Sequence, residues 1–332
     1  MKIVQTINCK VIDNDDYIRF KIKNLIESNC SVVRLNFKNF TDKDMKRIDR
    51  ILKCLKLEDE KSKLDILIDI PSTKNKYRLY VEQPEQIKKN NEILICSENY
   101  FSNEKKKIKI ANIEKSFFDC IDDLNIGTTI FWGDGEGKLS VINKGKGFLK
   151  VKAENDFFLF NNKSLSKFYE NVELKGKQIL YLKNIINNFN VKAVFLSFCE
   201  SPNEIKKFKS LFPQIDICAK IETEKALDNL NSILNVCDGI MIARGDLALN
   251  SSLKDFLSNQ NYIAKSTNTK NKKLYIATDI LMSLNEQDIP SRADLCDFEL
   301  LQSYSTHAII LKSSFFHKKR FSVVNKFIES VS

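Results

Sequence analysis

The chain has 332 residues, of which 43% are hydrophobic and 29% are charged, a composition typical of globular proteins and not of disordered ones. No apolar run approaches the roughly 18 residues that a membrane-spanning helix needs, and the N-terminus carries no apolar signal core. We therefore expect a cytoplasmic protein.

The formal net charge of +10 comes from lysines that are spread over most of the expected helices. The densest run, residues 105–107, lacks the interleaved aromatic side chains that single-stranded nucleic acid would stack on. The nine cysteines form no C-x-x-C pair, and the two histidines form no H-E-x-x-H pattern. We expect no nucleic-acid partner, no disulfide framework and no zinc site.

Short β-rich runs alternate with longer amphipathic segments, such as 17–28, 43–55 and 204–212, along most of the chain. This alternation predicts parallel strands that are joined by right-handed helical crossovers. Eight such units predict an α/β fold, a closed (β/α)8 TIM barrel. The expected strands are residues 2–7, 31–37, 64–70, 191–197, 215–221, 239–242, 273–277 and 308–311.

A long interval between the third strand and the next expected helix, 177–189, breaks this rhythm. Seven of the nine glycines fall between Gly127 and Gly176, and alternating apolar runs separate them. Glycines at tight turns between such runs predict a small β-rich, barrel-like domain. The run at 133–137 lacks G-K-[ST] and leads into no helix, so it predicts a hairpin turn. We expect a barrel at 1–79 and 171–332, with 80–170 forming a hinged lid over its C-terminal mouth.

Charged side chains gather where the expected strands end, which is where barrel enzymes carry their active sites. Glu222 and Asp246 suit Mg²⁺, and Arg34 and Lys220 suit an anionic substrate. The strand-end set is Arg34, Asn36, Asp69, Ser197, Lys220, Glu222, Arg244, Asp246, Thr278, Asp279 and Lys312.

The two remaining glycines, Gly239 and Gly245, lie in the segment 238–247, which reads D-G-I-M-I-A-R-G-D-L. This segment resembles the D-G-I-M-V-A-R-G-D-L of pyruvate kinase almost letter for letter. Further landmarks follow in family order over essentially the whole chain: K-I-V-Q-T-I at 2–7, R-L-N-F at 34–37, K-I-E at 220–222, A-T-D-I-L at 277–281 and P-S-R-A-D at 290–294.

The resemblance implies a role for each matching residue. Lys220 would neutralise the phosphoryl group during transfer and Arg34 would hold it, while Glu222 and Asp246 would bind Mg²⁺ or Mn²⁺. Thr278 would lie beside the methylene carbon that gains a proton. The amides of Ala243, Arg244, Gly245 and Asp246 would grip the substrate carboxylate, and the nucleotide would be bound by Asn36, Lys76 and Arg78.

The chain also departs from the family pattern. Two of the four positions that bind K⁺ in the family are Lys38 and Ile70 here, next to Asn36 and Asp69. Lys74 stands where family members that work without K⁺ carry a lysine, so we expect Lys74 or Lys38, beside Asp69, to replace the ion. K⁺ would then not be required.

At the end of the eighth strand, the family's S-G-E-T is replaced by K-S-S-F at 312–315. The resemblance is to a short form without the family's C-terminal regulatory domain. The function that it implies is a phosphotransferase acting on phosphoenolpyruvate or pyruvate and ADP or ATP, as in glycolysis, and a homodimer through the barrel fits it. A metal-dependent lyase or aldolase acting on pyruvate, and a non-catalytic binding protein, stay open as alternatives.

Overall fold

The computed structural model describes residues 1–8, 13–37, 40–59, 64–77, 79–81, 83–96, 108–110, 117–118, 121, 124–161, 163–251 and 253–331. The chain divides into two compact units. The first comprises Met1–Thr73, Glu173–Leu247 and Lys254–Ser332, and the second comprises Lys74–Val172 and Ala248–Leu253.

The first unit is built on eight parallel strands that close into a barrel in the order β1-β17-β16-β15-β14-β13-β3-β2. This confirms the predicted (β/α)8 fold, with each expected strand in place to within a residue or so at its ends. The strands are β1 (Lys2–Ile7), β2 (Val32–Asn36), β3 (Asp65–Pro71), β13 (Val191–Ser197), β14 (Asp216–Ile221), β15 (Gly239–Ala243), β16 (Lys273–Ala277) and β17 (Ala308–Leu311).

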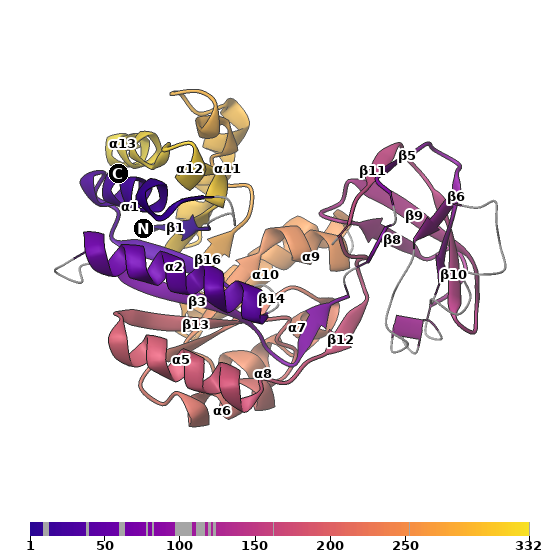
Figure 1. Ribbon diagram of the computed structural model, residues 1–332, viewed down its shortest axis with the longest axis horizontal. Helices are drawn as coiled ribbons and strands as arrows, with labels where there is room; N and C mark the ends of the chain where they lie inside the picture. Colours follow the sequence, from indigo (N-terminus) through magenta and orange to yellow (C-terminus); the bar gives the residue numbers. More distant parts are fainter. Residues whose placement is uncertain are drawn as a thin grey trace. The chain divides into compact units, whose positions relative to one another are not determined.

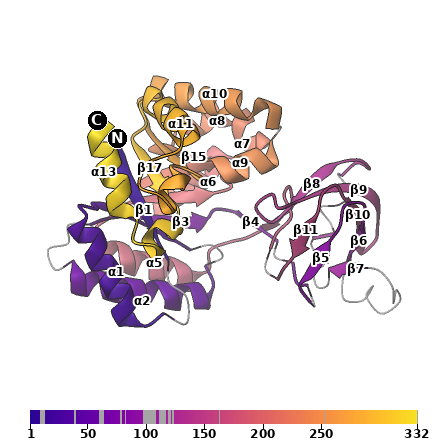
Figure 2. The same ribbon diagram turned by 90° about the horizontal axis from the view of Figure 1, so that it is seen from above.

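Helices surround the barrel, and the two chain ends lie near each other on it (Figures 1 and 2). Helix starts follow local chemistry: the Asn14 side chain accepts from the Tyr17 amide, and Thr41 forms a capping box with Asp44. The helices are α1 (Asp15–Glu27), α2 (Asp42–Glu58), α5 (Gly176–Asn188), α6 (Pro202–Leu211), α7 (Glu224–Asp228), α8 (Leu230–Leu234), α9 (Arg244–Asn250), α10 (Phe256–Thr269), α11 (Arg292–Ser303), α12 (Ser313–His317) and α13 (Phe321–Val331).

Two hydrophobic clusters of the barrel unit lie on the two faces of the strands. Residues such as Val33, Ile68 and Ile242 join the larger cluster, which includes side chains of the helices. Residues such as Val32, Leu67 and Met241 belong to a smaller cluster made of strand residues alone. Because side chains alternate between the two faces of a strand, the smaller cluster fills the barrel interior.

The second unit is rich in β-structure. Its five-stranded sheet has the order β7-β6-β10-β9-β8, and two further pairs join β5 to β11 and β4 to β12. A buried cluster around Trp132 forms its core. The strands are β4 (Lys74–Lys76), β5 (Glu85–Ile87), β6 (Glu92–Cys96), β7 (Ile108–Ile110), β8 (Thr129–Trp132), β9 (Gly137–Gly145), β10 (Phe148–Ala153), β11 (Phe157–Leu159) and β12 (Tyr169–Asn171).

The glycine-rich run at 133–137 is the turn between the antiparallel strands β8 and β9, as its sequence predicts. Gly133 and Gly135 both have positive φ there, which glycine adopts without steric cost. The second unit starts at Lys74, before the expected residue 80, because β4 pairs with β12 inside it. Among the described residues, no helix has both the length and the apolar character that crossing a membrane requires.

Gly239 allows β15 to pack closely between its neighbours, and replacing it should destabilise the barrel. A Cβ at Gly239 would lie 2.8 Å from the Lys273 carbonyl oxygen and 3.0 Å from the Cys218 sulfur. We expect Gly239→Ala to lower the free energy of unfolding by about 1–3 kcal/mol. The matched control is Gly176→Ala at the start of α5, where an added Cβ meets no atom within 4 Å and little should change.

The helical circular dichroism signal follows chiefly the barrel unit, whereas the fluorescence of the single tryptophan, buried Trp132, follows the second unit. Gly239→Ala should shift the denaturation midpoint seen by circular dichroism and leave the Trp132 transition in place. Equal circular dichroism midpoints for the two variants would show that the strand accommodates the methyl group.

Candidate active site

The polar residues at the barrel mouth continue the inward-facing rows of the strands. On three strands, a charged residue stands two positions after an apolar residue of the barrel interior. Arg34 follows Val32, Asp69 follows Leu67, and Lys220 follows Cys218 in this way. Because side chains two apart on a strand share a face, these groups point into the barrel end. The same inward-facing rows of side chains are therefore apolar inside the barrel and polar at its mouth.

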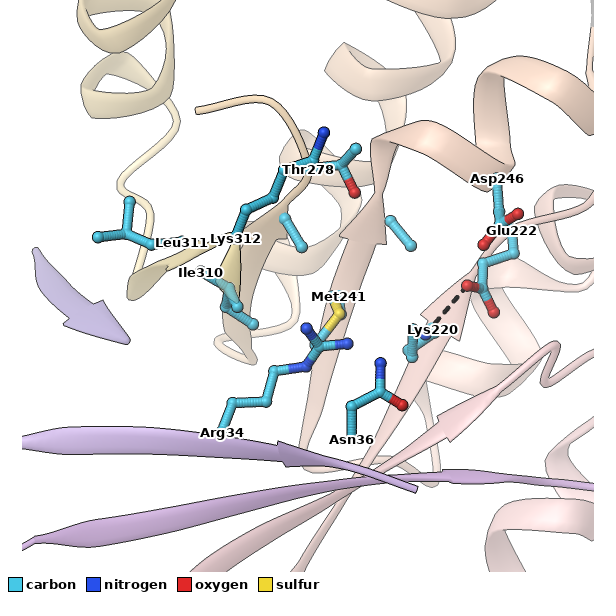
Figure 3. A pocket seen from close by; sticks show the side chains of 12 residues that line it. Arg34, Asn36, Lys220, Glu222, Met241, Asp246, Thr278, Ile310, Leu311 and Lys312 are labelled. Carbon is cyan, nitrogen blue, oxygen red and sulfur yellow. Dashed lines mark ion pairs between the residues drawn. The ribbon is translucent and has the colours of Figure 1, made fainter. Parts of the chain in front are cut away.

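A cavity of about 150 Å³ lies among these strand ends. Figure 3 shows Arg34 and Asn36 on one side of it, Glu222 and Asp246 close together on another, and Thr278 and Lys312 away from both. The cavity is lined by Arg34, Asn36, Lys220, Glu222, Met241, Ala243, Asp246, Ala277, Thr278, Ile310, Leu311 and Lys312.

Asp69 pairs with two of the cations that line the cavity, Arg34 and Lys220. The Asp69 side chain is 1% exposed. Its Oδ2 accepts hydrogen bonds from Nε of Arg34, at 3.1 Å, and from Nη2 of the same residue. The same oxygen lies 3.3 Å from Lys220 Nζ. Burial alone would raise the pKa of Asp69, but the charges of Arg34 and Lys220 hold it below its usual value. Thr6 accepts from Arg34 Nη1 at 3.1 Å and fixes the other side of the guanidinium.

Lys220 is held between acidic and neutral oxygens. Its Nζ lies 3.1 Å from Glu222 Oε1 and donates to Ser197 Oγ at 3.0 Å. Burial would lower the pKa of Lys220, but Asp69 and Glu222 raise it above its ordinary value. The amine is therefore a fixed positive charge in a buried position.

Glu222 is buried completely and is oriented by the Phe198 amide, which donates to its Oε2 at 2.6 Å. Burial raises the pKa of Glu222 to about 7, Lys220 opposes that shift, and the like charge of Asp246 adds to it. Two carboxylates that repel each other across a cavity are stabilised by a cation placed between them.

The donor set around Glu222 and Asp246 fits a magnesium-type ion. Mg²⁺ binds through oxygen, with one or two carboxylates and the rest of its octahedron from substrate and water. Within the described residues, no group of three or more His, Cys, Asp or Glu side chains offers a complete protein cage. The pair therefore suits an ion that the protein shares with a substrate.

Gly245 lets the first turn of α9 approach Thr278 closely. A Cβ on Gly245 would lie 3.1 Å from the Thr278 methyl carbon. Ala243 and Asp246, on either side of this turn, both line the cavity. This placement suits the predicted contact with a substrate carboxylate, which stays a prediction.

The Arg244 side chain binds the backbone turn at residues 278–279. It donates to both carboxylate oxygens of Asp297, at 2.6 and 2.9 Å, and to the carbonyl oxygens of Thr278 and Asp279. Thr278 and Asp279 have φ of 82° and 53°, conformations that non-glycine residues rarely adopt. Arg244 therefore positions the turn that carries Thr278, and only its backbone amide is a candidate for the predicted substrate contact.

The other predicted residues divide between the two units. Asn36 and Asp69 belong to the barrel unit, whereas Lys74 and Lys76 belong to the second. Lys38 and Arg78 lie outside the described residues, so their expected roles stay predictions.

Sequence reasoning missed three groups that shape the site: Thr6, Asp297 and the Phe198 amide. Thr6 could have been found, because it stands two residues after the interior residue Val4. The other two are brought to the site by folding across many residues, and no local pattern signals them.

Comparison with known proteins assigns this chain to a family. Residues 1–313 match the family model described as pyruvate kinase, barrel domain. Pyruvate kinase of Thermococcus litoralis is 27% identical over 298 residues, covering 87% of this chain and 61% of that protein. Pyruvate kinases of Mycoplasma genitalium and Thermotoga maritima are each 26% identical, over 88% and 83% of this chain and 60% and 59% of those proteins. The chain thus spans about three fifths of the length of these curated relatives, and it belongs to the pyruvate kinase family.

Proposed function

We propose that this protein transfers a phosphoryl group between phosphoenolpyruvate and ADP with Mg²⁺ as cofactor. The observation that carries the proposal is the joint placement of Arg34, Lys220, Glu222 and Asp246 around one cavity of about 150 Å³. That volume suits a small organic anion, and the groups suit its charges. The similarity to pyruvate kinases supports the same reaction class.

The catalytic contribution of these residues is positioning and charge neutralisation. Asp69 and Thr6 occupy three of the five N–H donors of Arg34, so the guanidinium is fixed and still has donors for a phosphoryl oxygen. Lys220 is held by Asp69, Glu222 and Ser197, and its fixed charge would neutralise the charge that develops as the phosphoryl group moves. Preformed charges of this kind are the main requirement of phosphoryl transfer.

The remaining groups orient the substrate. Glu222 and Asp246 would hold Mg²⁺, which would supply further neutralisation of the phosphoryl and enolate oxygens. The turn at 243–246 would bind the substrate carboxylate, and Thr278 would lie beside the methylene carbon. Lys76, Arg78 and Asn36 are proposed for the nucleotide on their places in the sequence.

The first test measures ATP formation from phosphoenolpyruvate, ADP and Mg²⁺ in wild type and in Lys220→Met. Because Lys220 acts on developing charge, we expect turnover to fall by about a thousandfold or more, while substrate affinity changes by less than about tenfold. Lys192→Met is the control, since Lys192 is exposed near the opposite end of a barrel strand. Circular dichroism establishes that each variant folds.

An active Lys220→Met enzyme would exclude this mechanism. No ATP formation by the wild type, together with nucleotide-independent release of pyruvate from an aldol substrate, would favour a lyase instead.

We further propose that catalysis does not require K⁺. Asp69 Oδ2 is already in ion pairs with Arg34 and Lys220, and the side chain of Ile70 has only apolar carbon where the family pattern has a side-chain oxygen. Asp69 Oδ1 is buried and has no hydrogen-bond partner among the described residues, so a cationic group is expected beside it. Lys74, by its place in the sequence, or Lys38 would supply that charge.

The rate should therefore be equal in sodium, potassium and tetramethylammonium chloride at constant ionic strength. A saturable activation by K⁺ of more than about threefold would show that other oxygen atoms complete a cation site.

A further inference from the structure

Lys312 is a pocket residue whose chemistry the proposed function does not use. It follows β17, two residues after Ile310, which lies inside the barrel, so its side chain continues the inward-facing row. The buried Gln5 amide donates to the Lys312 carbonyl at 3.0 Å and fixes the backbone at this point. The lysine is therefore placed by the strand and by a specific hydrogen bond.

The Lys312 ammonium is directed to the Thr278 side of the cavity. Its Nζ forms an ion pair with the carboxylate of Asp279, the residue next to Thr278. Figure 3 shows the side chain running up beside Thr278, away from Arg34 and Glu222. Arg244 holds the backbone carbonyls of both 278 and 279, so the counter-ion of Lys312 is carried by a fixed turn.

The cavity thus has two chemically different sides. The side with Arg34, Lys220, Glu222 and Asp246 carries the charges that suit phosphate and metal. On the other side, Thr278 and Lys312 are the lining residues with hydrogen-bond donors in their side chains. Of these two, only an ammonium group readily gives up a proton in water, because an alcohol is not among the ordinary titrating side chains.

We infer that Lys312 is the general acid that protonates the methylene carbon of the enolate left after phosphoryl transfer, an inference that rests on the proposed function. The enolate C=C electron pair forms the new C–H bond with a proton from Lys312, the Nζ–H bond breaks, and the enolate oxygen becomes the carbonyl of pyruvate. The neutral amine then takes a proton from water. Its side chain is 46% exposed, so solvent reaches it.

Asp279 acts as a positioning residue in this arrangement. Its carboxylate forms an ion pair with the ammonium and so holds it near Thr278. The ion pair is half-exposed, so it directs the lysine without locking it in a dry interior.

The test separates proton transfer from phosphoryl transfer. Wild type, Lys312→Met and Lys312→Arg are compared in two assays: ATP formation from phosphoenolpyruvate and ADP, and loss of the pyruvate methyl ¹H NMR signal in D2O with Mg²⁺ and ATP. Methyl exchange is the same protonation step in reverse, and it needs an amine that can take up a proton. Arginine keeps the positive charge but does not release its proton, so it separates charge from acid–base chemistry.

The matched control is Lys318→Met. Like Lys312, Lys318 forms an ion pair, in this case with Glu286, and its side chain is 45% exposed. Unlike Lys312, it does not line the cavity. Lys318→Met should behave as wild type in both assays.

We expect methyl exchange to fall by about a hundredfold or more in both Lys312 variants, and by a larger factor than ATP formation. Exchange at the wild-type rate in Lys312→Met, or its recovery in Lys312→Arg, would overturn the inference, since neither substitution leaves a releasable proton at this position. A wild-type protein that formed ATP but exchanged no methyl protons would also overturn it. A wild type inactive in both assays would overturn the proposed function itself, together with this inference.

Discussion

The site depends on one buried carboxylate, Asp69, and on the two cations that it holds. Asp69 lies on β3, Arg34 on β2 and Lys220 on β14, with Ser197 on β13 between them, so the network joins four consecutive strands of the barrel. A buried charge is costly unless it is paired and hydrogen-bonded, which explains why these groups are found together. Removing Asp69 would leave the partly buried Arg34 and the buried Lys220 without the carboxylate that lies between them.

The groups of the cavity that Asp69 does not hold are left to bind a metal or to act on a substrate. Glu222 is completely buried, and this burial, together with the like charge of Asp246, raises its pKa to about 7 although the ion pair with Lys220 opposes the shift. A divalent cation held by Glu222 and Asp246, as we propose, would relieve the repulsion between the two carboxylates. Away from them, Thr278 and Lys312 line the cavity with side-chain hydrogen-bond donors. In the function that we propose, this arrangement of charges would separate the side that binds phosphate from the side that delivers the proton.

Much of this could be predicted from the sequence, because barrel strands are short buried runs with a two-residue period. The eight strands and the inward-facing residues Arg34, Asp69, Lys220 and Glu222 follow from that period together with the family motifs. Other features depend on folding between distant segments. Asp297 reaches Arg244 only when α11 packs near the start of α9, so a residue expected beside the substrate has its side chain engaged elsewhere. The start of the second unit depends likewise on the pairing of β4 with β12.

We propose that Glu222 and Asp246 form a divalent-metal site at the mouth of this barrel. Titration of the protein with Mn²⁺ alone, followed by water-proton relaxation, tests it without relying on turnover. Replacing Glu222 by Gln should weaken Mn²⁺ binding at least about tenfold, roughly 1.4 kcal/mol, because one of two carboxylate ligands loses its charge. Glu224→Gln removes the same charge from an exposed residue nearby and should leave the affinity unchanged. Equal Mn²⁺ affinity in wild type and Glu222→Gln would contradict the account.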